Sequence, residues 1–199
     1  MPSRELGPWE PLRLDDVVEL FAGAPFRWWI AGGHALELHC GRSWRDHDDV
    51  DVGICRSDAG GLPAVLDGWE IAVAADGVLR VWRGEPVVPD RNENNLWCRR
   101  RPDGPWELDV IVGEGSADRW VYRRNPAVAL PWAEAVLASA TGVPYLAPEV
   151  QLLFKAKGLR PKDHADALEV IPMLDAHRRT RLQGWVAPKH PWQELLTAR

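Results

Sequence analysis

The sequence has few cysteines, no long hydrophobic run and no excess of positive charge, and each absence excludes a class of protein. Three widely spaced cysteines, Cys40, Cys55 and Cys98, argue against a disulfide framework and a zinc ribbon. No apolar run approaches the roughly 18 residues of a membrane-spanning helix, and the first residues lack the basic and apolar blocks of a signal peptide. The formal net charge of -5 argues against broad attraction to nucleic acid. We therefore expect a cytoplasmic protein with no membrane partner.

What the chain does contain is typical of a globular protein with a substantial core. Its 199 residues, 46% of them hydrophobic, suffice for one domain, or for one domain with a small appendage. Twelve tryptophans are unusually many. We expect most of them to pack in the core and one or two to line a ligand cleft.

The first third of the chain shows both helical and strand patterns. Helical spacing predicts a helix over 14–21, and an apolar strand follows and ends at Gly32 and Gly33. A short helix is expected next, ended by Gly41. The following segment alternates, which predicts a strand with an apolar face of Val50, Val52 and Ile54 and an opposite face of Asp49, Asp51 and Gly53.

Four further strands are expected, paired as antiparallel hairpins, at 69–76, 77–82, 94–100 and 106–113. In the last of them Asp109 falls on the face opposite Leu108, Val110 and Val112. Asp109 is therefore expected to lie beside Asp49 and Asp51 on one face of the sheet.

From about residue 144 the pattern becomes helical. A helix is expected to begin at Pro148, and one or two more over 161–186, interrupted by Pro172. We therefore predict an α+β fold in which a mixed β-sheet is flanked by helices. The division into domains is expected to be 1–142 and a small C-terminal helical part, 143–199.

Three carboxylates on neighbouring strands would form an all-oxygen site for a hard divalent cation such as Mg²⁺. Without a cation, Asp49, Asp51 and Asp109 would repel one another and raise at least one pKa. The alternative for the first two is an acidic strand end in solvent. The glycine pair favours a functional site, because backbone amides at Gly32 and Gly33, followed by a helix N-terminus, can approach phosphate oxygens.

The stretch "GGHALELHCGRSWRDHDDVDV" resembles the active-site motif of the DNA polymerase β-like nucleotidyltransferase superfamily, in the form used by aminoglycoside and lincosamide nucleotidyltransferases. The downstream "PWELDVIV" resembles the strand that carries their third carboxylate, and 145–174 resembles the helical region of uncharacterised bacterial relatives. The residues that match the motif are Gly32, Gly33, Arg45, His47, Asp49 and Asp51.

The resemblance implies an antibiotic-resistance type of transferase. It would move a nucleoside monophosphate from a nucleoside triphosphate, such as ATP, to a hydroxyl of a small molecule, with an aminoglycoside-like antibiotic as the suggested acceptor. Asp49 and Asp51 would hold Mg²⁺, or Mn²⁺ in its place, and Asp109 would complete the metal site or take the proton of the acceptor hydroxyl. Two positions beside the glycines depart from the pattern: His34 stands where relatives carry an aromatic residue, and Glu37 where they often carry Asp.

Further phosphate contacts are expected from Arg45 and His47, although Arg45 could instead form a salt bridge with Asp46 or Asp48. Of Lys155 and Lys157, two residues apart on a helix, Lys155 is expected to face the cleft. The segment 120–124 could supply a base-stacking ring and a phosphate-binding arginine, or be a solvated strand end.

Two other functions stay open at this point. One is nucleotidyl transfer to RNA or protein, as in toxin-like members of the superfamily; RNA is disfavoured because the sequence has no basic block beyond 98–101. The other is a nucleotide-binding module without turnover. The sequence does not determine the oligomeric state.

Overall fold

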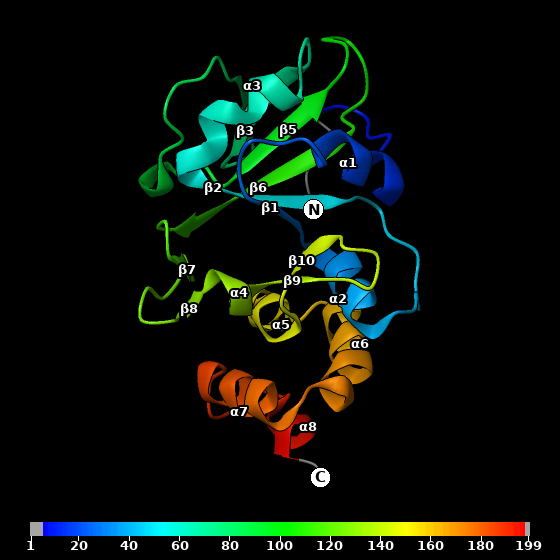
Figure 1. Cartoon of the computed structure of the whole chain (residues 1–199), viewed down its shortest axis with the longest axis vertical. Helices are drawn as coiled ribbons and strands as arrows, with labels where there is room; N and C mark the ends of the chain where they lie inside the picture. Colours follow the sequence, from blue (N-terminus) through cyan, green and yellow to red (C-terminus); the bar gives the residue numbers. More distant parts are fainter. Residues whose placement is uncertain (1–5, 198–199) are drawn as a thin grey trace.

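The chain builds a ten-stranded mixed β-sheet within residues 6–197, the part that the computed structural model describes (Figure 1). The strands are β1 Trp28–Ile30, β2 Asp51–Cys55, β3 Glu70–Ala75, β4 Val78–Val81, β5 Asn95–Arg99, β6 Leu108–Gly115, β7 Arg119–Val121, β8 Ala129–Pro131, β9 Val136–Ala138 and β10 Pro144–Leu146. The main path runs β4-β3-β5-β6-β2-β1-β10-β9, while β7 pairs with β6 and β8 with β7. The pairs β2–β6 and β1–β10 are parallel and the other strand pairs antiparallel.

Helices surround this sheet, which confirms the predicted α+β class. They are α1 Leu14–Phe21, α2 Gly32–Cys40, α3 Leu62–Val65, α4 Trp132–Ala135, α5 Pro148–Ala156, α6 Pro161–Val170, α7 Ala176–Trp185 and α8 Gln193–Thr197, with the 3-10 helices η2 Arg56–Gly61, η3 Pro89–Arg91 and η4 Ile171–Met173. The sequence signals act as expected. Gly41 ends α2 in the left-handed conformation, with φ of 67°, and Pro172 separates α6 from α7.

The strand β2 shows why the sheet is buried on both faces here. Val50, Val52 and Ile54 are buried, as the alternation predicted. The opposite face was expected to be acidic, but within the strand it is acidic only at Asp51, because Asp49 lies in the loop before β2. Gly53, on the same face, lies under Trp29. A Cβ atom on Gly53 would lie 2.0 Å from Trp29 Nε1, so this position accepts no side chain while the indole stays in place.

The four predicted hairpin strands are present as β3, β4, β5 and β6, in antiparallel pairs. The strand β6 then pairs in parallel with β2, and Asp51 stands directly opposite Asp109 in the register. The sheet thus brings together two acids that are far apart in the sequence.

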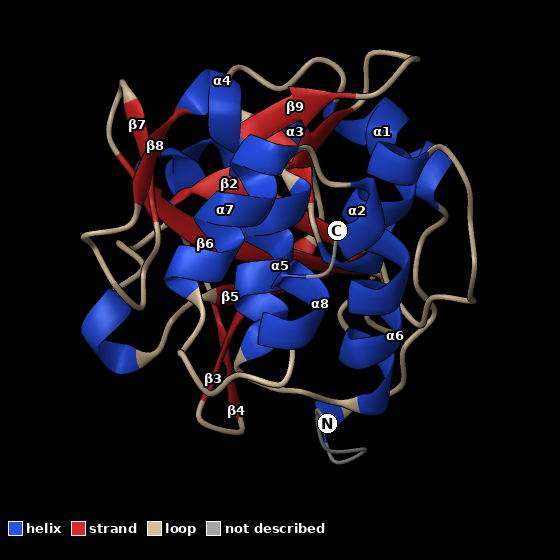
Figure 2. Ribbon diagram, turned by 90° about the horizontal axis from the view of Figure 1, so that it is seen from below, coloured by secondary structure: helices blue, strands red, loops and turns tan. Residues whose placement is uncertain are grey.

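The C-terminal helices form a layer beyond the sheet. In Figure 1, α7 and α8 lie at the end of the molecule farthest from α3, and Figure 2 shows α5, α7 and α8 from that end. The buried Glu149 of α5 ties α7 to this layer by accepting hydrogen bonds from Arg178 and Arg181.

The expected boundary at residue 142 does not separate sheet from helices. The strand β10 follows it and pairs with β1 and β9 near one end of the sheet path, so the sheet extends into the region expected to be helical. The outermost residues of the expected parts, 1–5 and 198–199, lie outside the described residues. Over 6–197, no helix combines the length and apolar character needed to cross a bilayer.

Candidate active site

The candidate site centres on Asp51, the first residue of β2, and Asp109, the second residue of β6. Burial raises the pKa of Asp51 to about 7, with a further contribution from the charge of Asp49. Burial, and then the charge of Asp51, raise the pKa of Asp109 well above its usual range. When both carboxylates are ionised, their negative charges are poorly balanced by nearby positive charge. A divalent cation bound between them would supply that balance.

Asp49 does not join this pair as closely as the sequence predicted. It is exposed and lies in the loop before β2, so the i, i+2 rule for strand side chains does not apply to it. Among residues 6–197, the three aspartates are not a group whose ligand atoms all lie within 4.8 Å of one another. Asp49 remains near enough for its charge to raise the pKa of both other acids.

Asn95 of β5 orients the third carboxylate. Its Nδ2 donates to Asp109 at 3.0 Å from Oδ1 and 2.9 Å from Oδ2. Sequence reasoning missed Asn95. The available signal was weak: an asparagine at the start of a predicted strand, where this residue type is depleted.

The two glycines pack closely against the site. Gly32 has φ of 67°, and a Cβ atom on it would lie 2.3 Å from Asp51 Oδ2. A Cβ atom on Gly33 would lie 2.2 Å from Arg45 Nη2 and from His47 Cε1. Gly32 therefore requires glycine, because of its positive φ and its contact with Asp51, whereas a side chain at Gly33 would displace Arg45 and His47. The amide of Gly32 donates to Gln151 Oε1 of α5 at 2.9 Å, a second residue that sequence reasoning missed.

Arg45 forms a salt bridge, but its partner is neither Asp46 nor Asp48 as considered from the sequence. Arg45 Nε and Nη2 donate to Asp166 Oδ1 and Oδ2 at 2.9 and 3.1 Å, and Nη1 donates to the backbone oxygen of Asp46. Asp166 is fully buried and also faces Lys155 Nζ at 2.9 Å. Although burial alone would raise the pKa of Asp166, its bonds with Arg45 and Lys155 lower that pKa to about 2.

His47 also lies beside Gly33, and its side chain is largely buried. Its Nε2 is 3.0 Å from Glu37 Oε1, and its ring centroid is 4.0 Å from that of His34. Burial, and then the nearby His47, lower the pKa of His34 to about 4.

A cationic pocket of about 470 Å³ opens beside Asp51. Lys155 lines it while paired to Asp163 and Asp166. Lys157 lines it too, contrary to the expectation that only one lysine would, because Lys157 is in the turn after α5 rather than on the helix. The full lining is Gly32, Asp51, Arg124, Gln151, Phe154, Lys155, Lys157, Gly158, Arg160 and Asp163.

The aromatic ring in this pocket belongs to Phe154. Trp120, a stacking candidate from the sequence, is buried in the core, so that part of the expectation was wrong. The arginine of the same segment does reach the pocket: Arg124 Nη1 donates to the backbone oxygen of Phe154 at 3.2 Å.

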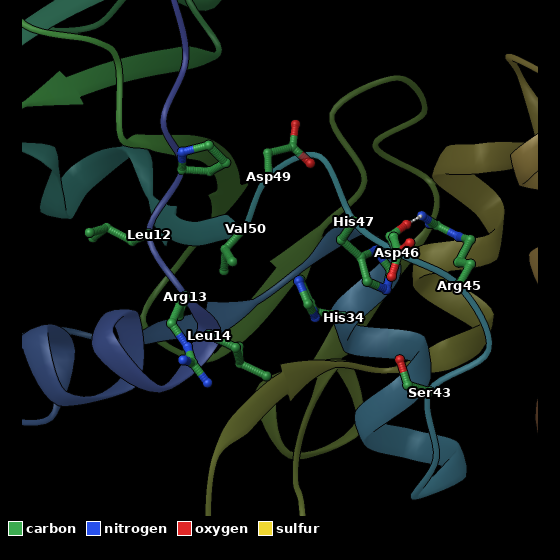
Figure 3. A pocket seen from close by; sticks show the side chains of 11 residues that line it. Leu12, Arg13, Leu14, His34, Ser43, Arg45, Asp46, His47, Asp49 and Val50 are labelled. Carbon is green, nitrogen blue, oxygen red and sulfur yellow. Dashed lines mark hydrogen bonds between the residues drawn. The ribbon is translucent and has the colours of Figure 1, made fainter.

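A second pocket, of about 370 Å³, lies on the side of Asp49 (Figure 3). It shares no lining residue with the cationic pocket. Since Asp49 lines one pocket and Asp51 the other, both pockets lie near the start of β2. The lining of the second pocket is Pro11, Leu12, Arg13, Leu14, His34, Ser43, Arg45, Asp46, His47, Asp49 and Val50.

Comparison with known proteins gives a match over the segment that contains the glycines and the first two acids. A family model described as aminoglycoside-2''-adenylyltransferase matches residues 13–83, which include Gly32, Gly33, Asp49 and Asp51 but not Asp109. A comparison with curated proteins gives no match.

Solved structures resemble the chain over most of its length. The solution structure of the antibiotic-resistance factor ANT(2'')-Ia is 16% identical, with a TM-score of 0.57, and the match covers 86% of this chain and 87% of that one. The crystal structure of ANT(2'')-Ia with adenylyl-2''-tobramycin is 15% identical, with a TM-score of 0.56, covering 86% and 94%. The lincomycin-bound lincosamide antibiotic adenylyltransferase LnuA is 17% identical, with a TM-score of 0.53, covering 82% and 98%.

These neighbours are nucleotidyltransferases that act on antibiotics, and at such identities the likeness shows a shared fold. The resemblance predicted from the motif is thus confirmed: residues 13–83 resemble the aminoglycoside-2''-adenylyltransferases, and the chain as a whole has the fold of the antibiotic nucleotidyltransferases.

Proposed function

We propose that this protein is a metal-dependent nucleotidyltransferase that moves a nucleoside monophosphate, from ATP in the first instance, to a hydroxyl of a small molecule of the aminoglycoside type. The observation that carries the proposal is the direct pairing of Asp51 with Asp109, beside a glycine that Asp51 contacts. The antibiotics bound by ANT(2'')-Ia and LnuA support the choice of acceptor class.

The residues fit a divalent cation. The half-buried carboxylates of Asp51 and Asp109, with raised pKa values, and Asp49 close by form a hard oxygen donor set that suits Mg²⁺, with Mn²⁺ as the alternative. We assign Asp49, Asp51 and Asp109 to this site. When bound, the ion would stabilise charge on the phosphate oxygens. Asn95 orients Asp109, whose carboxylate would complete the metal site or take the proton of the acceptor hydroxyl.

The nucleotide is assigned to the cationic pocket. Its exposed Lys157 can contact phosphates directly. Arg160, which is bound to Asp163, and Lys155, which is buried between Asp163 and Asp166, line the same pocket as paired cations. Gly32 and Gly33 would face the phosphates at the N-terminus of α2. Phe154 offers a ring for the base.

Arg45 and His47 have a different role from the one suggested by the motif alone. Because both contact the space beside Gly33, and because Arg45 is engaged by Asp166, we assign them to shaping the glycine turn against which the phosphates would lie. Their effect on nucleotide binding would therefore be indirect.

The acceptor is assigned to the second pocket, on the Asp49 side. Asp46 and Asp49 are exposed carboxylates in its lining and suit an acceptor with amino groups. In this arrangement residues 1–142 supply the catalytic part, and 143–199 the part that closes the nucleotide side. A cytoplasmic location would give access to nucleoside triphosphates.

The alternative of transfer to RNA finds less support in the structure. Two of the three arginines of the basic block are engaged: Arg99 pairs with Glu70, and Arg100 with Glu107. A continuous basic surface for RNA is therefore not formed by this block. A nucleotide-binding module without turnover differs from the proposed enzyme only in its products, so it is an outcome of the test below.

Calorimetric titration of ATP and GTP, with Mg²⁺ or Mn²⁺, tests the proposal. The native protein is compared with an Asp49→Asn, Asp51→Asn double variant and with the control Asp48→Asn, an exposed acid in the same loop. We expect metal-dependent binding that the double variant loses and the control keeps. The assignment of the site would be wrong if nucleotide affinity were the same without metal and in the double variant.

A screen for pyrophosphate release with amino-sugar and lincosamide acceptors then separates an enzyme from a binding module. Release that depends on one acceptor class supports the transferase. Tight nucleotide binding with no release for any small acceptor, RNA or protein would instead identify a module without turnover.

A further inference from the structure

A second cluster of potential metal ligands lies outside the aspartate site. His34 and Glu37 are three residues apart on α2 and so share a face of that helix, and His47 comes from the loop before β2. One ligand atom from each of the three lies within 4.8 Å of the other two. Figure 3 shows the His34 and His47 side chains next to each other at the edge of the second pocket.

The side chains of the cluster are held in place by burial and by hydrogen bonds. The side chains of His47 and Glu37 are only 8% and 9% exposed. Ser43 Oγ donates to Glu37 Oε2 at 2.5 Å and the amide of Trp44 donates to Oε1 at 3.0 Å. These bonds fix the carboxylate in place, as neighbours of metal ligands commonly do.

One atom of the cluster lacks a proper partner. His47 Nε2 is fully buried and has no hydrogen bond of acceptable geometry, although Glu37 Oε1 is 3.0 Å away. A buried polar group without a hydrogen bond is destabilising, so this nitrogen is available to a ligand that can reach it. A cation placed between the imidazoles and the carboxylate would satisfy Nε2 and Oε1 together.

We propose that His34, Glu37 and His47 form a binding site for a divalent transition metal of the Zn²⁺ type, separate from the aspartate site. Two imidazole nitrogens and one carboxylate oxygen are a borderline donor set that suits Zn²⁺ or Co²⁺ rather than Mg²⁺, which prefers oxygen ligands alone. The nearby positive charge of Arg45 is directed to Asp166, which lessens its repulsion of the ion.

The site would leave a coordination position accessible from solvent. His34 is half-buried and lines both the second pocket and a neighbouring pocket of about 330 Å³. A fourth ligand, water or a donor group of a bound small molecule, can therefore enter from the pocket side. This inference does not depend on nucleotidyl transfer.

The test is titration of the full-length, chelator-treated protein with Zn²⁺ by calorimetry, and with Co²⁺ by visible absorption. We expect one Zn²⁺ per chain and the absorption of Co²⁺ in a tetrahedral nitrogen and oxygen environment. His34→Gln removes a half-exposed ligand with little risk to folding, and should weaken Zn²⁺ binding by roughly tenfold or more. The control His177→Gln, an exposed histidine on α7, should leave it unchanged.

Two further comparisons separate this site from the proposed Mg²⁺ site. The Asp49→Asn, Asp51→Asn double variant should keep its Zn²⁺ affinity, and His34→Gln should keep Mg²⁺-dependent ATP binding. The proposal is overturned if the native protein binds no Zn²⁺, or if His34→Gln binds it as tightly as the native protein. Loss of Zn²⁺ binding in the aspartate variant alone would equally overturn it, by placing the ion at the carboxylates.

Discussion

Arg45, in the loop between α2 and β2, forms a bidentate ion pair with Asp166 of α6. This pair links the C-terminal helices to the glycine turn. The buried carboxylate also holds Lys155. One side chain of the helical region thus fixes two cations beside the candidate site.

This relationship predicts an acid-sensitive contribution to stability. The pKa of Asp166 is lowered from 3.8 to about 2 in the folded protein, so its stabilisation is present above about pH 4 and is lost as the pH falls through about 2. Asp166→Asn should lower the free energy of unfolding at pH 7 by on the order of 2 kcal/mol. It should also make stability less dependent on pH between about 4 and 2.

Urea denaturation at a series of pH values measures both effects. Asp48→Asn is the control, because Asp48 is exposed and has only a 3.4 Å contact with Lys162. If Asp166→Asn has the same acid dependence as the native protein, the ion pair does not stabilise the fold in this way.

Glu149 and Glu134 offer a matched pair for testing how burial decides the strength of an ion pair. Both accept from Arg181, but Glu149 is fully buried and also holds Arg178, whereas the side chain of Glu134 is 44% exposed. Glu149→Ala should destabilise the fold by up to about 3–5 kcal/mol, since Arg178 and Arg181 would lose their shared buried partner and keep only the more exposed Asp175 and Glu134. Glu134→Ala should cost less than about 1 kcal/mol. Similar losses of free energy of unfolding in the two variants would show that burial does not decide the strength of these ion pairs.

Lys157 should contribute to nucleotide binding without contributing to folding. It is exposed in the lining of the cationic pocket, whereas Lys155 is buried and structural. Lys157→Ala should weaken ATP binding by about tenfold, the equivalent of one charge-assisted contact of about 1.4 kcal/mol, and leave the melting temperature unchanged. Calorimetry and a thermal melt check the two halves, with the exposed Lys189→Ala as the control. An unchanged affinity for ATP would remove Lys157 from the site.

Local structure could be predicted from the sequence because local chemistry determines it. The helix α1, the end of α2 at Gly41, the hairpin strands and the break at Pro172 all follow from periodicity and from residues with restricted backbones. The short strands β8, β9 and β10 were missed. Each has three residues, too few for alternation to show.

The candidate site could be predicted only in part, for a different reason. The motif indicated the acids and the glycines, but the partners that orient them come from distant segments: Asn95 for Asp109, Gln151 for Gly32 and Asp166 for Arg45. Which polar residues meet across a sheet or between helices depends on register and packing. Neither is encoded in the spacing of a single segment.

The parallel pairing of β2 with β6 has a consequence for how the site comes into being. Asp51 lies within the 13–83 segment that matches the family model, and Asp109 lies beyond it. Several strands must fold back between them before the two acids can meet, and such non-local contacts form slowly because loop closure must come first. A nascent chain released after residue 83 would carry the signature of the family without the acid pair. The proposed metal site would exist only once β6 has paired with β2.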